Sequence, residues 1–253
     1  MAEGKHEHGK MEIAEHEKTF AAFVRISTWV IGGRAGVPDL SLRHRRVSGP
    51  VRARRPYLAL AVALPLIVAG CGAESVWAPD DEVARAIYAH DGPPTITLFT
   101  MINNRSNEGA HAGLMVSGSQ RLIFDPAGSF NHPQLPERND VFFGITEAAH
   151  AFYIDYHARE TFRVKENRIV VTPEQAEIAL RLMQQAGPVA PTQCNIAIVN
   201  VLREVPGFED IPRSLFPLNT MRYFEGRGDA TTVLHTDDSP DQRGDLVRVP
   251  LVR

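Results

Sequence analysis

The sequence predicts an α+β fold in which an antiparallel sheet with hairpins packs against helices. Residues 95–102 are β-branched and aromatic, which is typical of a strand. Residues 110–125 and 162–171 each form two strand-like runs around a short polar turn, which indicates hairpins. Residues 172–187 and 191–203 carry helix start signals followed by apolar side chains at helical spacing.

Charge is divided unequally along the 253 residues, whose formal net charge is −3. Residues 1–71 carry a net charge of +5, so the remainder carries −8. An acidic folded part argues against nucleic acid as a partner. The basic part has a different explanation, because it contains a leader.

Three arginines precede an apolar run at residues 57–70, and Cys71 follows at once. A basic start, a short apolar core and a small-residue end are typical of a secretory signal peptide. The run is shorter than the roughly 20 residues that a spanning helix needs, and Pro65 interrupts it. We therefore predict a signal peptide at residues 47–70.

The end of this leader, Val68-Ala69-Gly70-Cys71, resembles a bacterial lipobox. The resemblance implies cleavage before Cys71, lipid attachment to its sulfur, and a membrane as partner through that anchor. Gly72 is not the acidic residue associated with inner-membrane retention, which favours the outer membrane, on its periplasmic side. The alternative is an uncleaved hydrophobic anchor that ends in a chance cysteine.

Residues 1–31 do not fit an exported lipoprotein. The segments 1–13, 17–25 and 28–30 resemble the start of subunit IV of bacterial aa3-type cytochrome c oxidase. That family continues into a membrane-spanning helix, whereas a glycine-, proline- and arginine-rich stretch follows here. We interpret residues 1–46 as disordered or as joined from an adjacent reading frame.

Residues 71–225 hold the predicted α+β domain, and each element follows from its pattern. Thr172, Pro173 and Gln175 supply the cap, the first-turn proline and the capping-box partner of a helix that ends at Gly187. The polar residues 226–253 are predicted to form a mobile tail. The other expected elements are a helix at 79–88, a strand at 95–102, a hairpin of 110–116 and 121–125, a helix at 146–157, a second hairpin of 162–165 and 168–171 around Glu166 and Asn167, and a helical turn at 220–224.

Cys194 is the best candidate nucleophile. Pro191 closes the preceding loop and Thr192 is the expected N-cap, so Cys194 falls in the first helical turn. Unpaired N–H groups and the helix dipole favour the thiolate there, and the Cys194 N–H offers an oxyanion hole. An acylated Cys71 leaves Cys194 as a free thiol. The alternative is a small buried hydrophobe on a core helix.

His111 and Asp125 lie on the two strands of the first hairpin, so pairing can place them side by side. A carboxylate that holds a neutral imidazole toward a thiol is the arrangement that activates a cysteine. Each residue also has an ordinary reading, as a hydrogen-bonded strand histidine and as a turn-forming aspartate before proline.

The stretch His111 to Val116, followed by a hairpin, Asp125 and a later Gln193-Cys194 at a helix start, resembles the circularly permuted papain-like hydrolases. These are relatives of NlpC-type peptidases and lecithin-retinol acyltransferase. The resemblance covers residues 95–205 and implies a papain-like fold, with His111 as base, Asp125 as orienter and Cys194 as nucleophile. It implies hydrolysis of an amide, such as a peptidoglycan peptide, or of a lipid ester through an acyl-enzyme. The continuation after Cys194 is less polar and aromatic than in that family.

Other readings remain open. His150 and His157 share a helix face and, with Asp155 nearby, are either metal ligands or partly exposed histidines. The sequence has no H-E-x-x-H spacing and no phosphate-binding glycine loop, so no cofactor and no metal are expected. Two functional alternatives are a non-catalytic envelope lipoprotein that binds cell-wall or protein partners, and a membrane-associated protein similar to cytochrome c oxidase subunit IV.

Overall fold

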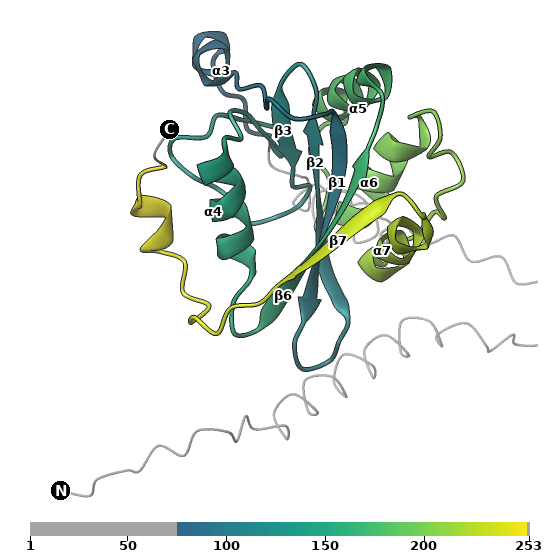
Figure 1. Cartoon of the computed structure of the whole chain (residues 1–253). Coiled ribbons are helices and arrows are strands. Elements are labelled where there is room, and N and C mark those ends of the chain that lie inside the picture. The colour runs from purple at the N-terminus through teal and green to yellow at the C-terminus, as the bar shows by residue number, and fades with distance from the viewer. Residues whose placement is uncertain (1–74, 252–253) are drawn as a thin grey trace, which may run out of the picture. The chain divides into compact units, whose positions relative to one another are not determined.

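The computed structural model describes residues 75–251 (Figure 1). The predictions for residues 1–46, for the signal peptide at 47–70 and for Cys71 lie outside this range. The strands are β1 (Thr95–Asn103), β2 (Gly109–Ser117), β3 (Arg121–Phe124), β4 (Glu137–Arg138), β5 (Val141–Phe142), β6 (Phe162–Val170) and β7 (Ala230–His235). The helices are α3 (Asp80–Ala86), α4 (Glu147–His157), α5 (Pro173–Gln185), α6 (Cys194–Arg203), α7 (Pro217–Gly226) and the 3₁₀ turn η2 (Leu246–Arg248).

The seven strands form one antiparallel sheet in the order β4-β5-β3-β2-β1-β6-β7. Strand β1 lies between β2 and β6: residues 95–102 pair with β2, with a register shift after Met101, and the whole strand pairs with β6. The expected α+β class is therefore confirmed. The first predicted hairpin is β2 and β3, and the predicted helix at 172–187 has its full capping box at Thr172 and Gln175.

Helices cover both faces of the sheet, with α4 on one side and α5, α6 and α7 on the other (Figure 1). Alternate residues of each strand point to opposite faces, so the central strands are buried on both sides. Leu98 and Leu114 of β1 and β2 belong to the core beneath α5 to α7, whereas Phe99 and Met115 belong to the core beneath α4.

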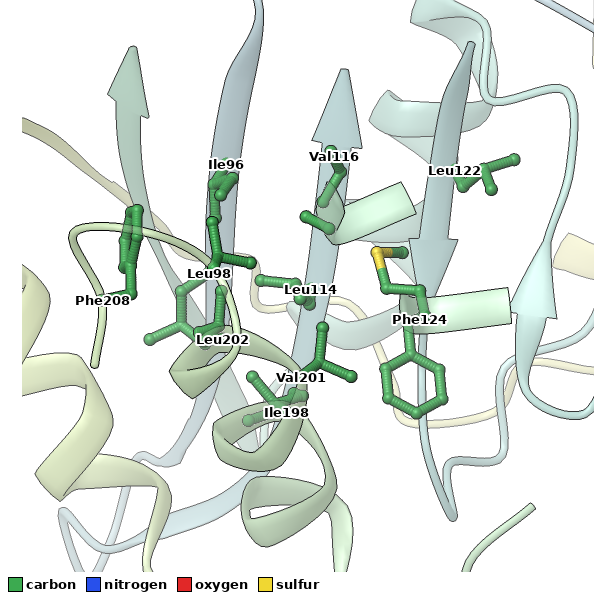
Figure 2. Packing of buried hydrophobic residues seen from close by; sticks show 14 of the residues in the cluster. Ile96, Leu98, Leu114, Val116, Leu122, Phe124, Ile198, Val201, Leu202 and Phe208 are labelled. Atoms are coloured by element: carbon green, nitrogen blue, oxygen red, sulfur yellow. The ribbon is translucent and has the colours of Figure 1, made fainter. Parts of the chain in front are cut away.

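The larger core fixes the position of α6 against β2 (Figure 2). Three of the residues that α6 contributes to this core, Ile198, Val201 and Leu202, recur at three- and four-residue spacing, so they form one apolar stripe that faces the sheet. Because α6 carries Cys194 as its first residue, this packing also places the thiol. The labelled core residues are Ile96, Leu98, Leu114, Val116, Leu122, Phe124, Ile198, Val201, Leu202 and Phe208.

The predicted hairpin around Glu166 and Asn167 is wrong. The strand β6 continues through both residues and pairs with β1 and β7. Both side chains are buried but have partners: Arg168 and His235 contact the Glu166 carboxylate, and Asn167 Nδ2 donates to Thr232 Oγ1 at 2.8 Å. Pairing with two neighbouring strands therefore overrides the local turn preference.

The prediction of a mobile tail at residues 226–253 also needs correction, because β7 lies inside it. This strand pairs with β6 from Ala230 to His235 and forms one edge of the sheet. Most of its residues are exposed, so it lacks the buried apolar run that marks a core strand. After β7 the chain returns to the α4 face, where Leu246 packs against the core and His132 Nε2 lies 3.0 Å from the Val249 carbonyl oxygen.

Within residues 75–251, no helix has the length and apolar character needed to cross a membrane.

We expect Leu202→Ala to lower the free energy of unfolding by about 2–5 kcal/mol, because it leaves a cavity between α6 and the sheet. Leu202 is fully buried, whereas Leu215 is 56% exposed. The control Leu215→Ala should change the free energy by less than about 0.5 kcal/mol. Urea unfolding measures both values, and equal small losses would contradict the packing described for α6.

Candidate active site

The strand β2 is irregular next to His111. Met101 pairs with His111 but Ile102 pairs with Gly109, so Ala110 has no partner on β1 and forms a bulge. Such bulges re-aim side chains and are common beside active sites. On its other side β2 meets β3 only from Leu114 onward, so β3 does not cover the edge at His111. This open edge gives another part of the chain access to the imidazole.

Asp125 follows β3 directly and anchors His111. Its Oδ1 lies 2.8 Å from His111 Nε2 and accepts a second hydrogen bond from Tyr153 Oη at 2.6 Å. A carboxylate only accepts hydrogen bonds, so His111 Nε2 carries the proton in this pair. The Asp125 side chain is completely buried, and its backbone N–H donates to the Asp140 carbonyl oxygen at 2.8 Å. The predicted pairing of His111 with Asp125 is therefore present.

Two glycines make room for this carboxylate. A Cβ on Gly113 would fall on the Tyr153 hydroxyl and lie 3.2 Å from Asp125 Oδ1. A Cβ on Gly128 would fall on Asp125 Oδ2. Neither position needs glycine for its backbone angles, so the requirement comes from close packing around Asp125.

Cys194 is the first residue of α6, as expected, but its cap differs from the prediction. The N-cap is Gln193, whose side chain makes no capping hydrogen bond, and Thr192 lies outside the helix with a φ of +73°. The predicted Thr192 N-cap is therefore wrong. The thiol is 5% exposed and interacts with the His111 imidazole and with the backbone amides of Ala112 and Asn195.

His111 and Cys194 reach this point from opposite sides of the sheet. His111 shares the α4 face with Gly113 and Met115, whereas α6 packs on the other face. They meet at the uncovered edge of β2. Because Nε2 is engaged with Asp125, the Nδ1 atom is the ring nitrogen available to the thiol.

The charges of the three groups support one another. Burial acts to lower the pKa of His111, but the Asp125 carboxylate and the Cys194 sulfur outweigh it and raise this pKa to about 10. Burial acts to raise the pKa of Asp125, but His111 lowers it to about 2. Burial likewise opposes ionisation of Cys194, and His111 with the nearby amides lowers the pKa of the thiol. The arrangement therefore favours the thiolate–imidazolium pair over a neutral thiol and a neutral imidazole.

Two residues of this site were missed as functional candidates in the sequence. Tyr153 lies on the helix predicted at 146–157, where it is fully buried and donates to Asp125. His157 is buried rather than partly exposed, its Nδ1 bonds the Tyr153 carbonyl oxygen, and its ring stacks near His111 with centroids 6.0 Å apart. Their spacing of four residues on a helix ending in histidine was the available signal.

The residues that could hold a metal ion differ from the set His150, His157 and Asp155 considered from the sequence. Asp155 pairs with Arg159 at 2.8 Å and not with a histidine. Among residues 75–251, His111, Asp125 and His157 offer ligand atoms within 4.8 Å of one another. A metal ion would need a His111 nitrogen, and both nitrogens already face Asp125 and the thiol. Metal binding and thiol activation therefore exclude each other at this site.

Comparisons with known proteins match only the N-terminal part of the chain. A family model described as bacterial aa3 type cytochrome c oxidase subunit IV matches residues 6–33. This match confirms the resemblance predicted for residues 1–31. No curated protein and no solved structure matches the chain. The resemblance of residues 95–205 to papain-like hydrolases stays a prediction.

We expect Asp125→Asn to raise the pKa of Cys194, because without the carboxylate His111 loses the proton that stabilises the thiolate. In the wild-type protein, the rate of alkylation by iodoacetamide should rise with pH around a midpoint below the ordinary thiol value of about 8.5. The variant should move that midpoint upward by at least about one unit. Asp155→Asn, on the outer side of α4, is the control, and identical midpoints in all three proteins would contradict the coupling.

Gly113→Ala should weaken the His111–Asp125 contact, because the new methyl group falls on the Tyr153 hydroxyl. The expected cost is about 1–3 kcal/mol of unfolding free energy, with slower Cys194 alkylation. Tyr153→Phe removes the clashing oxygen, so the double variant Gly113→Ala/Tyr153→Phe should recover part of the loss. A double-mutant cycle measured by urea unfolding tests this, and purely additive losses would argue against the contact.

Proposed function

We propose that this chain is a cysteine hydrolase that cleaves an amide or ester bond through an acyl-enzyme. The observation that carries this proposal is the chain of contacts from the Cys194 thiol to His111 and from His111 to the buried Asp125 carboxylate. The raised pKa of His111 and the lowered pKa of Cys194 support a nucleophile that is ionised before substrate arrives.

In this reaction the Cys194 thiolate attacks the carbonyl carbon, and a C–S bond forms while the carbonyl oxygen becomes an oxyanion. The N–H groups of the first turn of α6 have no helical partner, so they can donate to that oxygen. The His111 imidazolium then protonates the leaving amine or alcohol as its bond to carbon breaks. Asp125 keeps the ring in place throughout.

The second half restores the enzyme. Neutral His111 takes a proton from water, the resulting oxygen nucleophile attacks the thioester carbon, and the C–S bond breaks. The carboxylic acid leaves and gives its remaining proton to solvent, and the thiolate–imidazolium pair is formed again. The proposed substrates are peptidoglycan peptides first and lipid esters second, because the lipobox-like Cys71 would hold the chain at the cell envelope.

The N-terminal match supports a coarser proposal on location. We infer that the chain is associated with a bacterial membrane, since residues 6–33 match a subunit of a bacterial oxidase. Lipid attachment at Cys71, a periplasmic orientation and an outer-membrane site are the finer parts of this proposal. A non-catalytic envelope lipoprotein that binds a partner through the same fold is the competing function.

We expect wild-type protein to hydrolyse 4-nitrophenyl acetate with a burst of nitrophenolate and to carry an acetyl group on Cys194, detectable by intact-protein mass spectrometry. Cys194→Ala should abolish both signals, and His111→Gln should slow hydrolysis by at least about 100-fold. His90→Gln is the control, because His90 pairs with Glu147 away from the site. A wild-type protein without the burst and the acetyl group would favour the non-catalytic function, and hydrolysis that survives Cys194→Ala would contradict the role of Cys194.

A further inference from the structure

A pocket of about 320 Å³ adjoins the catalytic histidine on the α4 side of the sheet. We call it the Arg243 pocket, and its walls include Met101, Ala110, His111, His157, Phe162 and Arg243. It thus combines strand residues, the last turn of α4 and the segment that follows β7. The proposed mechanism uses only His111 of this group.

Arg243 is held in place but keeps unused donors. Its Nε donates to the Tyr156 carbonyl oxygen at 2.7 Å, and its guanidinium lies 4.8 Å from the centre of the Tyr156 ring. Within residues 75–251 it pairs with no carboxylate, whereas Arg159 nearby pairs with Asp155. The terminal nitrogens of Arg243 are therefore available on a side chain whose orientation is already fixed.

The pocket has no acidic side chain in its wall. Asp125 lies behind His111 and is occupied by His111 and Tyr153. His157 is neutral at physiological pH, because burial together with the charges of His111 and Arg243 lowers its pKa to about 4. Two cations, Arg243 and protonated His111, thus border a cavity without a counter-charge of its own.

We propose that the Arg243 pocket binds a carboxylate of the substrate, so that the enzyme selects amides or esters with a free carboxylate near the scissile bond. This inference rests on the proposed function, since it assigns specificity to the same site. A guanidinium binds a carboxylate through two parallel hydrogen bonds, which fixes orientation as well as charge. A bound carboxylate would also hold the substrate beside His111.

The test uses two alkylating agents of nearly equal size, anionic iodoacetate and neutral iodoacetamide. We expect the ratio of their rates with Cys194 to fall about tenfold in Arg243→Gln, since one charge-assisted contact is worth a factor of this order. Arg243→Lys keeps the charge without the planar fork and should give an intermediate ratio. Arg248→Gln is the matched control, because Arg248 lies in the same segment with an 81% exposed side chain.

An equal ratio in the wild-type protein and all three variants would overturn the carboxylate assignment. Limited proteolysis of Arg243→Gln tests whether the segment after β7 keeps its place on the α4 face. If it does not, Arg243→Lys still tests the carboxylate assignment, because it keeps the positive charge. The two proposals fail separately. The proposed function fails if hydrolysis of 4-nitrophenyl acetate is absent or does not depend on Cys194, whatever the alkylation ratio.

Discussion

The buried contact between the Asp125 carboxylate and the His111 imidazole is the constraint on which the site depends. A carboxylate without exposure is tolerated only when charge and hydrogen bonds compensate for lost hydration. Here one oxygen receives both His111 and Tyr153. The contact therefore ties together β2, the end of β3 and α4, and removing one partner would leave a buried charge uncompensated.

Close packing around Asp125 explains features that have no chemical role of their own. Gly113 and Gly128 leave the space that Tyr153 and the carboxylate occupy. The bulge at Ala110 changes the register of β2 just before His111. These backbone features fix the position of the imidazole. A fixed position keeps the ring within reach of the thiol, which proton transfer between them requires.

The sheet lies between the two residues of the proposed catalytic pair. His111 belongs to the face covered by α4, and Cys194 begins a helix on the opposite face. They meet because β3 ends early and leaves the edge of β2 uncovered. The same opening exposes the Ala112 backbone amide to the sulfur, so the sheet contributes to the acidity of the thiol together with the Asn195 amide of α6. The segment after β7 adds Arg243 from a third direction.

The sequence by itself determined the local elements and their signals. Strand β1, the hairpin of β2 and β3, the capped helix α5 and the placement of Cys194 in the first turn of α6 follow from side-chain pattern and capping chemistry, which act over a few residues. The proximity of His111 and Asp125 was predicted from the hairpin, although the register of β2 and β3 ends at Leu114 and Phe124 and pairs neither residue. The N-terminal resemblance also rests on sequence alone.

Tertiary structure decided what depends on contacts between distant residues. The local sequence predicts a turn at Glu166 and Asn167, but pairing with β1 and β7 keeps β6 extended through both residues. The exposed β7 has no core pattern, and it exists because β6 offers unpaired backbone groups. The spacing of Tyr153 and His157 places them on one helix face but does not say what that face meets, and Arg243 has no local signal at all. Only packing of α4 and the C-terminal segment against the sheet brings the three residues to the site.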